Sequence, residues 1–243
     1  MNPMAKKNSS NIATHPPLER EPAVSAPKTK ARILLVDDHP IVREGLSTRL
    51  NAEPDLFICA LAADAHEAMA RVADSSPDLM ITDLSLGGRP GLELVKDMAS
   101  QHPFLPVLVL SIHDETLWAE RVLRAGARGY IMKSQATQKV VDAVRRVLAG
   151  GIWVSEPINE MLLYRVTGKR TPTAASSLES LSDRELEVYQ MIGHGLTVRE
   201  IATKLYLSPK TVEVHRENIK DKLKLKSAME LIRHAVTHLL DNS

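Results

Sequence analysis

Polar side chains that can do chemistry follow four short apolar runs in the first half of the chain. Asp37 and Asp38 come directly after ILLV, Asp83 follows LMIT, Ser111 closes VLVLS, and Lys133 follows YIM. Two adjacent carboxylates raise each other's pKa unless a cation lies between them. Magnesium suits such a place, because it binds one or two carboxylate oxygens and keeps several waters. The paired aspartates therefore predict a site for a divalent cation.

A cation held beside Asp83 makes this carboxylate a candidate nucleophile toward a phosphoryl group. Lys133 and Ser111 then supply an ammonium and a hydroxyl that can contact the oxygens left after the transfer. Any one of these residues alone would more often be a polar group that merely ends a strand. Because five of them follow strand-like runs, we predict that they act together, with a divalent cation such as Mg²⁺ held by Asp37 and Asp38 and with Asp83 as the nucleophile.

The apolar runs belong to a regular alternation of strand-like and helix-like segments. Strands are expected at residues 32–36, 56–60, 79–82, 107–111 and 129–132. Helices are expected near residues 40–51, 65–73, 91–101, 114–125 and 137–149. This order predicts an α/β fold with a doubly wound five-stranded parallel sheet and helices on both faces. Ligands of such sheets bind at the carboxyl ends of the strands, so the polar residues are expected to converge there.

Four segments of this region resemble the receiver domain of bacterial two-component response regulators. They read LLVDDHP, ITDLS, LSIHD and ARGYIMK, and the resemblance covers about residues 31–150. It implies a flavodoxin-like fold that receives a phosphoryl group from a phosphohistidine on a cognate sensor histidine kinase. One position departs from the pattern, because many relatives carry a proline four residues after the phosphoacceptor, where this chain has Gly87.

The resemblance also implies roles for individual residues of this chain. Asp83 is the implied phosphoacceptor, and Mg²⁺ is held by Asp38 and Asp83 with help from Asp37. Ser111 and Tyr130 are implied to move together on activation. Most of these roles agree with the chemistry that the side chains suggest by themselves, and the role of Tyr130 comes only from the resemblance.

Helix-start signals organise the last sixty or so residues of the chain. SDRE, TVRE and SAME have the Ser/Thr-x-x-Glu form of a capping box, and SPK places Pro209 at a first helical position after Ser208. These signals predict four helices. The middle two are separated by the short turn YL, which is typical of a helix-turn-helix whose second helix enters the major groove of DNA.

Helical periodicity assigns two faces to that second helix. Val212, Ile219 and Leu223 fall on one stripe and are expected to pack inward. The opposite face carries Val214, and an exposed valine among charged neighbours suits contact with a thymine methyl group. Lysines beside this face can meet phosphates. The predicted DNA-binding residues are Lys210, Thr211, Val214, His215, Glu217, Asn218, Lys220, Lys222 and Lys224.

The segment from about Leu178 to Leu240 resembles the DNA-binding domain of the LuxR, FixJ and NarL kind. It contains LSDRELEVYQMIGHGLTVREIATKLYLSPKTVEVHRENIKDKLKLKSAMELIRHA. The resemblance implies binding to promoter DNA and pairing of two copies through the last helix, Ala228 to Leu240. Together with the receiver resemblance, it implies a NarL/FixJ-type transcriptional regulator that is activated by phosphorylation and forms a homodimer when phosphorylated.

Composition divides the chain into four parts. Residues 1–30 predict a disordered tail, residues 31–150 the receiver, residues 151–177 a linker, and residues 178–243 a small all-α helix-turn-helix domain. The net charge is only +1, but residues 31–150 hold 13 basic and 16 acidic residues, whereas Lys204 to Lys226 hold seven basic and three acidic. Different partners are therefore expected for the two domains.

The expected compartment is the cytoplasm, with no membrane partner. No apolar run approaches the ~20 residues that a membrane span needs. The first residues, MNPMAKKNSS, also lack the apolar core of a secretion signal.

Two other classes of function remain open. An aspartyl phosphatase of the haloacid dehalogenase kind would need an acid where Ser85 stands, so no enzymatic activity is predicted. A phosphorylation-independent DNA-binding regulator could use the receiver for dimerisation only. A phosphorylation assay separates this second alternative from the favoured function.

Overall fold

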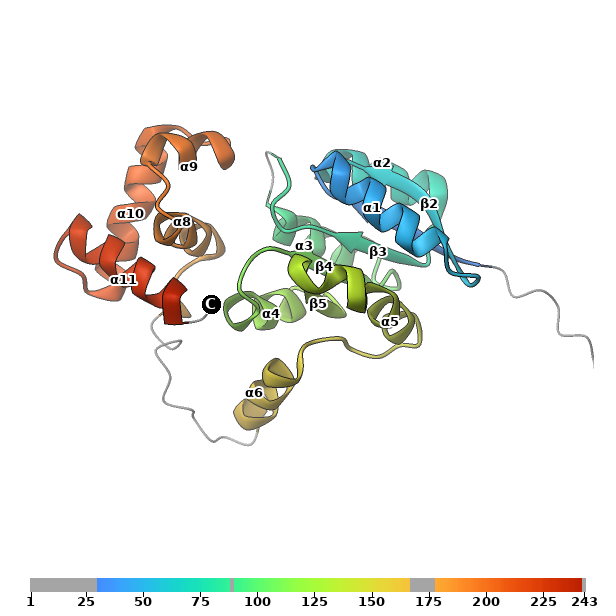
Figure 1. Cartoon of the computed structure of the whole chain (residues 1–243). Coiled ribbons are helices and arrows are strands. Elements are labelled where there is room, and N and C mark those ends of the chain that lie inside the picture. The colour runs from blue at the N-terminus through green and yellow to red at the C-terminus, as the bar shows by residue number, and fades with distance from the viewer. Residues whose placement is uncertain (1–29, 88–89, 167–177, 242–243) are drawn as a thin grey trace, which may run out of the picture.

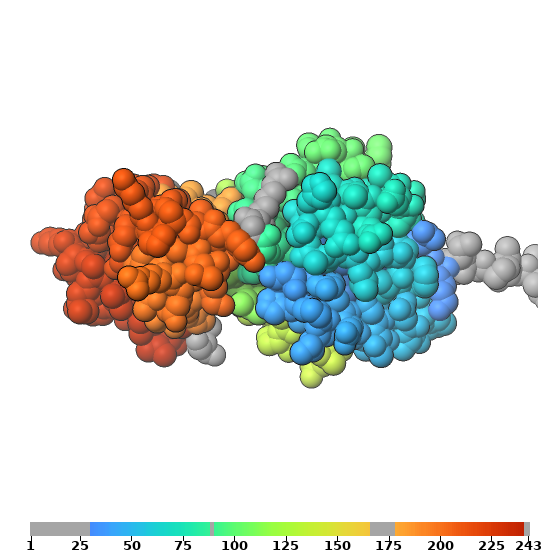
Figure 2. All heavy atoms as spheres, turned by 90° about the horizontal axis from the view of Figure 1, so that it is seen from above, coloured from blue at the N-terminus to red at the C-terminus, as the bar shows by residue number. Residues whose placement is uncertain are grey.

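The chain folds into an α/β domain followed by a domain made of helices (Figure 1). The computed structural model describes residues 30–87, 90–166 and 178–241. All but the last residue of the predicted tail at residues 1–30, and the last part of the predicted linker, residues 167–177, lie outside the described residues. Seen from a second direction, the helical domain is a separate lobe against the α/β domain (Figure 2). Over the described ranges, no helix is long and apolar enough to cross a membrane.

The α/β domain contains a five-stranded parallel sheet in the order β2-β1-β3-β4-β5. The strands are β1 (Ala31–Val36), β2 (Leu56–Ala62), β3 (Leu79–Thr82), β4 (Val107–Ser111) and β5 (Gly129–Met132). β3 and β4 are buried along their whole length, which is why they are continuous apolar runs in the sequence. The strand order reverses between β1 and β3, so the expected ligand site lies at the carboxyl ends of these two neighbours.

Helices cover both faces of the sheet (Figure 1). One face carries α1 (Pro40–Asn51) and α5 (Ala136–Leu148), and the other carries α2 (Ala65–Ser75), α3 (Gly91–Gln101) and α4 (Glu115–Arg124). The side chains of β1 alternate accordingly: Ile33 and Leu35 pack with α1 and α5, whereas Leu34 and Val36 pack on the other face. The predicted doubly wound architecture is therefore confirmed.

Residues 151–166, which the sequence assigns to the linker, pack onto the α/β domain. The backbone of Trp153 exchanges hydrogen bonds with Tyr130 and Arg128, at 2.9 and 3.0 Å, and so extends the sheet beyond β5. The following helix, α6 (Glu156–Val166), lies against α4 and buries Ile158. The part of the predicted linker that the structure describes is thus an ordered extension of the α/β domain.

The second domain contains the four helices that the sequence predicts. They are α8 (Asp183–Gly193), α9 (Val198–Lys204), α10 (Pro209–Leu223) and α11 (Ala228–Asp241). Complete capping boxes begin α8 and α9, and Pro209 follows the N-cap Ser208 at the start of α10. The start of α11 differs in one detail. Ser227 accepts from Glu230 N, but the Glu230 carboxylate accepts from Lys226 N instead of Ser227 N.

Candidate functional site

Three aspartates meet where the strand order reverses. Asp37 and Asp38 follow β1, and Asp83 follows β3, the neighbour of β1 in the sheet. The sheet itself sets their positions, because Asp83 N donates to the Val36 carbonyl at 2.9 Å. One ligand atom from each aspartate and one from His39 all lie within 4.8 Å of one another. The structure therefore brings together the three carboxylates that the sequence singles out.

Lys133 is the cation beside these carboxylates. It follows β5, and its Nζ lies 2.7 Å from Asp37 Oδ2 and 2.8 Å from Asp83 Oδ2. Burial raises the pKa of Asp83, and the Lys133 ammonium opposes this rise. Burial also disfavours the charge on Lys133, but the Asp83 and Asp37 carboxylates outweigh that effect and raise the pKa of Lys133. Lys133 therefore stays a cation between two buried carboxyl groups.

The oxygen atoms of this cluster fit a divalent cation. Asp83 Oδ1 is buried and accepts no hydrogen bond from the described residues. Asp37 Oδ2 and Asp38 Oδ1 also accept no hydrogen bond there, although each has a basic side chain beside it as an ion-pair partner. A buried carboxylate oxygen without a donor costs free energy unless a cation contacts it. Asp37, Asp38 and Asp83 are therefore the residues that would hold Mg²⁺, which prefers such oxygen ligands.

Ser111, at the end of β4, and Tyr130, in β5, both form hydrogen bonds with His113, which lies on the loop that follows β4. Both are buried, and Ser111 Oγ accepts from His113 N at 3.1 Å while the Tyr130 hydroxyl donates to the His113 carbonyl at 2.7 Å. The His113 ring reaches further, since its Nε2 lies 3.0 Å from Oγ of Ser85, two residues after Asp83. The sequence supplies LSIHD as part of a resemblance but assigns no role to His113. Only the folded chain shows that His113 joins these polar side chains.

α10 presents most of the predicted DNA-binding residues on its outer side. Val212 and Ile219 are fully buried and Leu223 is partly buried, as the periodicity predicts. Val214 is 51% exposed, so the valine is indeed on the outer face. Among the other predicted residues, Thr211, His215 and Lys220 are partly buried, whereas Lys210, Glu217, Asn218, Lys222 and Lys224 are exposed.

Two of the lysines predicted to meet phosphates have carboxylate partners within the domain. Lys220 Nζ lies 2.8 Å from Glu217 Oε2. Lys222 Nζ lies 2.6 Å from Oε2 of Glu185, a residue of the capping box of α8. Lys224 ends α10 in the left-handed backbone region, with φ 57°. In this conformation Lys220 and Lys222 can reach a phosphate only by giving up part of their contact with these carboxylates.

Both domains match known protein families. Residues 33–145 match the response regulator receiver domain, and residues 179–235 match the luxR family of bacterial regulatory proteins. The oxygen regulatory protein NreC of Staphylococcus carnosus (strain TM300) is 36% identical over 209 residues, which are 84% of this chain and 96% of NreC. The chain belongs to the two-component response regulators with a LuxR-type DNA-binding domain. This response regulator is also 37% identical to NreC of Staphylococcus epidermidis (strain ATCC 35984) over 210 residues, with the same coverage.

Solved structures share the architecture of this response regulator. The LuxR-family response regulator from Aurantimonas sp. SI85-9A1 is 34% identical, with a TM-score of 0.53, over 57% of this chain and 99% of that chain. RcsB from Salmonella enterica serovar Typhimurium was solved bound to a promoter in the presence of the phosphomimetic BeF3⁻. It is 23% identical, with a TM-score of 0.61, over 86% of this chain and 100% of the RcsB chain. The likeness to RcsB concerns the fold.

Proposed function

We propose that this response regulator receives a phosphoryl group on Asp83 from a phosphohistidine of its cognate sensor histidine kinase. The phosphorylated chain forms a homodimer in the cytoplasm, and α10 of each copy binds promoter DNA. In this proposal the chain is a phosphoryl acceptor and a DNA reader, not an enzyme. One observation carries it: buried Asp83 pairs with Lys133 through Oδ2, while its Oδ1 accepts no hydrogen bond from the described residues.

The side chains around Asp83 suggest how the transfer proceeds. Asp83 Oδ1 forms the new bond to phosphorus while the bond from phosphorus to the donor imidazole nitrogen breaks, and that nitrogen takes up a proton. Asp37, Asp38 and Asp83 would hold Mg²⁺, which would supply the positive charge that lets an anionic donor approach. Lys133 holds Asp83 Oδ2 during the attack. After the transfer, the Lys133 ammonium and the Ser111 hydroxyl contact the phosphoryl oxygens.

The outer face of α10 supports the DNA-binding part of the proposal. In this proposal Val214 and Glu217 contact base edges, and Lys220, Lys222 and Lys224 contact phosphates. Lys210, Thr211, His215 and Asn218 complete the proposed surface. One helix-turn-helix buries too little DNA for tight specific binding, so two copies should bind half-sites about one helical turn apart.

Incorporation of a phosphoryl group tests the chemistry directly. With Mg²⁺ and acetyl phosphate, intact-mass measurement should find one alkali-labile phosphoryl group per chain, and Asp83→Asn should abolish it. Asp74→Asn removes an exposed carboxylate of α2 and provides the matched control, which should be labelled like the wild type. Chelation of Mg²⁺ should mimic Asp83→Asn, because the metal must offset the charge of three carboxylates and the donor. Undiminished labelling of Asp83→Asn would contradict the assignment.

The second candidate function is a DNA-binding regulator that ignores phosphorylation. The receiver would then serve for dimerisation alone, and Asp83→Asn would bind DNA like the wild type both with and without acetyl phosphate. The cluster of Asp37, Asp38 and Asp83, with buried oxygen atoms that accept no hydrogen bond from the described residues, favours the phosphorylated switch, because a surface used only for pairing does not need such a cluster.

A further inference from the structure

The receiver and the DNA-binding domain contact each other through α4 and α8. Trp118, on α4, is fully buried, and its Nε1 donates to Gln190 Oε1 on α8 at 2.8 Å. Gln190 is itself only 9% exposed. A buried indole N–H that is satisfied by a buried amide defines one orientation of two packed surfaces. The two domains therefore meet at a specific contact.

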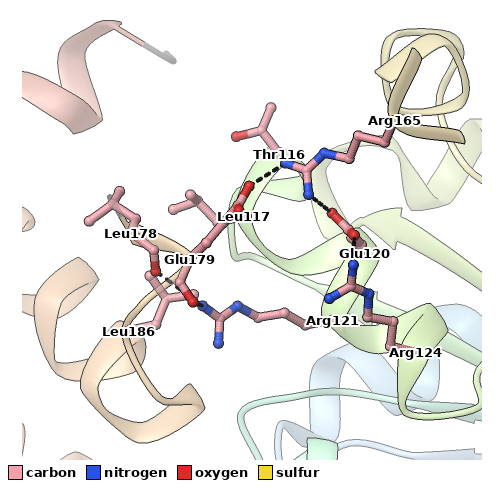
Figure 3. Close-up of a pocket in the computed structure, with 9 residues that line it drawn as sticks. All are labelled: Thr116, Leu117, Glu120, Arg121, Arg124, Arg165, Leu178, Glu179 and Leu186. Carbon is pink, nitrogen blue, oxygen red and sulfur yellow. Dashed lines mark hydrogen bonds and ion pairs between the residues drawn. The ribbon is translucent and has the colours of Figure 1, made fainter. Parts of the chain in front are cut away.

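Ion pairs surround this contact. Arg121, on α4, lies 2.9 Å from Asp183 at the start of α8, and Lys96, on α3, lies 3.2 Å from the same carboxylate. Arg165, on α6, pairs with Glu179, and these two side chains help to line a cavity of about 160 Å³ between the domains (Figure 3). Solvent-accessible ion pairs of this kind contribute little individually. They support the contact, and none of the residues that form them belongs to the aspartate cluster.

His113 connects the contact to the phosphoacceptor site. On one side, its N–H donates to Ser111 Oγ and its carbonyl accepts from the Tyr130 hydroxyl. On the other side, its ring centre lies 5.3 Å from that of Trp118, and the Gln190 side chain is close enough to the ring to favour its protonated form and so raise its pKa. One loop residue thus touches both switch side chains and both members of the α4–α8 contact.

We propose that His113 couples the two sites, so that phosphorylation of Asp83 weakens the contact between Trp118 and Gln190. The inference rests on the proposed function, since it assumes a phosphoryl group on Asp83. To contact that group, the Ser111 hydroxyl must turn toward Asp83, and the backbone of His113 that is bonded to it must follow. A small shift is enough, because a packed interface has few intermediate arrangements. The DNA-binding domain is then released to pair with a second copy.

A simpler role for His113 would be to hold the domains together equally in both states. A residue of that kind changes how often the domains separate, but not the factor by which phosphorylation changes their separation. A coupling residue determines the factor itself, because this factor is the ratio of the separation equilibrium with phosphate to the separation equilibrium without it. Lys96, on α3, offers the matched control, because it supports the contact through an ion pair with Asp183 and its other ion-pair partner is Glu93 of the same helix.

Trp118 can report domain separation by its own fluorescence. The chain has two tryptophans, and Trp153→Phe leaves Trp118 alone. This background should keep the fold, because Trp153 joins the sheet through its backbone. When the domains separate, Trp118 meets water, so its emission moves to longer wavelength and acrylamide quenches it more strongly. We call the form in which Trp118 contacts Gln190 closed, and the form in which the domains are separated open. The two signals give the open-to-closed ratio of the full chain with and without acetyl phosphate and Mg²⁺.

In this background, phosphorylation should raise the open-to-closed ratio by about tenfold, a common size for coupling between sites. Lys96→Ala should raise the ratio of the unphosphorylated protein and keep the same tenfold response. His113→Ala should reduce the response to less than about twofold. Gln190→Ala leaves the receiver unchanged and should reduce the response in the same way, so an altered receiver fold cannot account for the result.

Two results would overturn the inference. The first is an unchanged tenfold response in both His113→Ala and Gln190→Ala, which would make His113 an ordinary interface residue. The second is a Trp118 signal that does not change when Asp83 carries a phosphoryl group. Intact-mass measurement on the same samples shows whether Asp83 carries a phosphoryl group. If it does, either result contradicts the role of His113; if it does not, the proposed function itself has failed.

Discussion

Lys133 Nζ lies 2.8 Å from Asp83 Oδ2, and this ion pair joins a partly buried ammonium to a buried carboxylate at the carboxyl ends of the strands. The same ammonium also contacts Asp37. Removing it would leave two neighbouring buried carboxylates without a cation. Breaking a buried pair in this way costs about 3 to 5 kcal/mol. Lys133 is therefore part of what stabilises the receiver as well as part of its proposed chemistry.

Lys133→Ala is accordingly expected to lower the free energy of unfolding by about 3 kcal/mol when Mg²⁺ is chelated. Added Mg²⁺ should restore more stability to this variant than to the wild type, because an ion that binds the folded chain replaces the missing charge. Urea unfolding followed by circular dichroism measures both effects. Lys139→Ala removes an exposed lysine of α5 and should change the free energy by no more than about 0.5 kcal/mol. Equal stability of Lys133→Ala and the wild type without metal would contradict the proposed role of the ion pair.

Glu217→Ala should raise the affinity of the protein for DNA of any sequence, because it frees Lys220 from its 2.8 Å ion pair and removes a negative charge near phosphate. The slope of log affinity against log salt should steepen by about one unit. Preference at individual base pairs should relax at the same time, by about 1 to 3 kcal/mol. Titration of single-base duplex variants at several salt concentrations measures both quantities.

Glu160→Ala is the control for net charge in the Glu217 experiment, because it removes an exposed carboxylate of α6, far along the chain from α10. It should leave the salt slope and the base preference unchanged. If Glu217→Ala behaves like Glu160→Ala, then Glu217 and Lys220 face away from DNA, and the rotation assigned to α10 is wrong.

The contact between Trp118 and Gln190 should weaken in acid. Burial lowers the pKa of His113 from 6.5 to about 4; Gln190 opposes this shift, while His194 and Lys133 add to it. The His113 ring binds a proton less readily when the domains are in contact than when they are separated. The contact is therefore complete above about pH 6.5 and is lost as the pH falls toward 4. Trp118 emission in the Trp153→Phe background should therefore shift to longer wavelength at about pH 5.5. The same shift in His113→Asn would show that another group is responsible.

Periodicity and strand-end chemistry predicted most of what positions the aspartate cluster. Asp37, Asp38, Asp83 and Lys133 follow strands whose order in a parallel sheet places their carboxyl ends on one edge. Their convergence needs no knowledge of individual contacts. The starts of α8, α9 and α10 were predictable for a similar reason, because capping residues act locally on the backbone of the first turn.

Contacts between the domains could not be predicted in this way. Trp118 and Gln190 lie on the apolar stripes of two amphipathic helices, and nothing in either stripe shows that they face each other. The same limit explains why α6 was assigned to the linker. Its stability depends on packing against α4, which short-range sequence signals do not contain. The pairing of Lys222 with Glu185 is likewise a property of how α10 packs on α8.

The central claim is that a phosphoryl group on Asp83 increases dimerisation and DNA binding. Sedimentation velocity with a fluorescent duplex tests this most directly, using a duplex that is enriched from a random-sequence pool by the protein treated with acetyl phosphate and Mg²⁺. The account predicts two protein copies per duplex and at least about tenfold tighter binding after phosphorylation, with no change for Asp83→Asn. The same stoichiometry and affinity for the wild type with and without a phosphoryl group on Asp83 would contradict it.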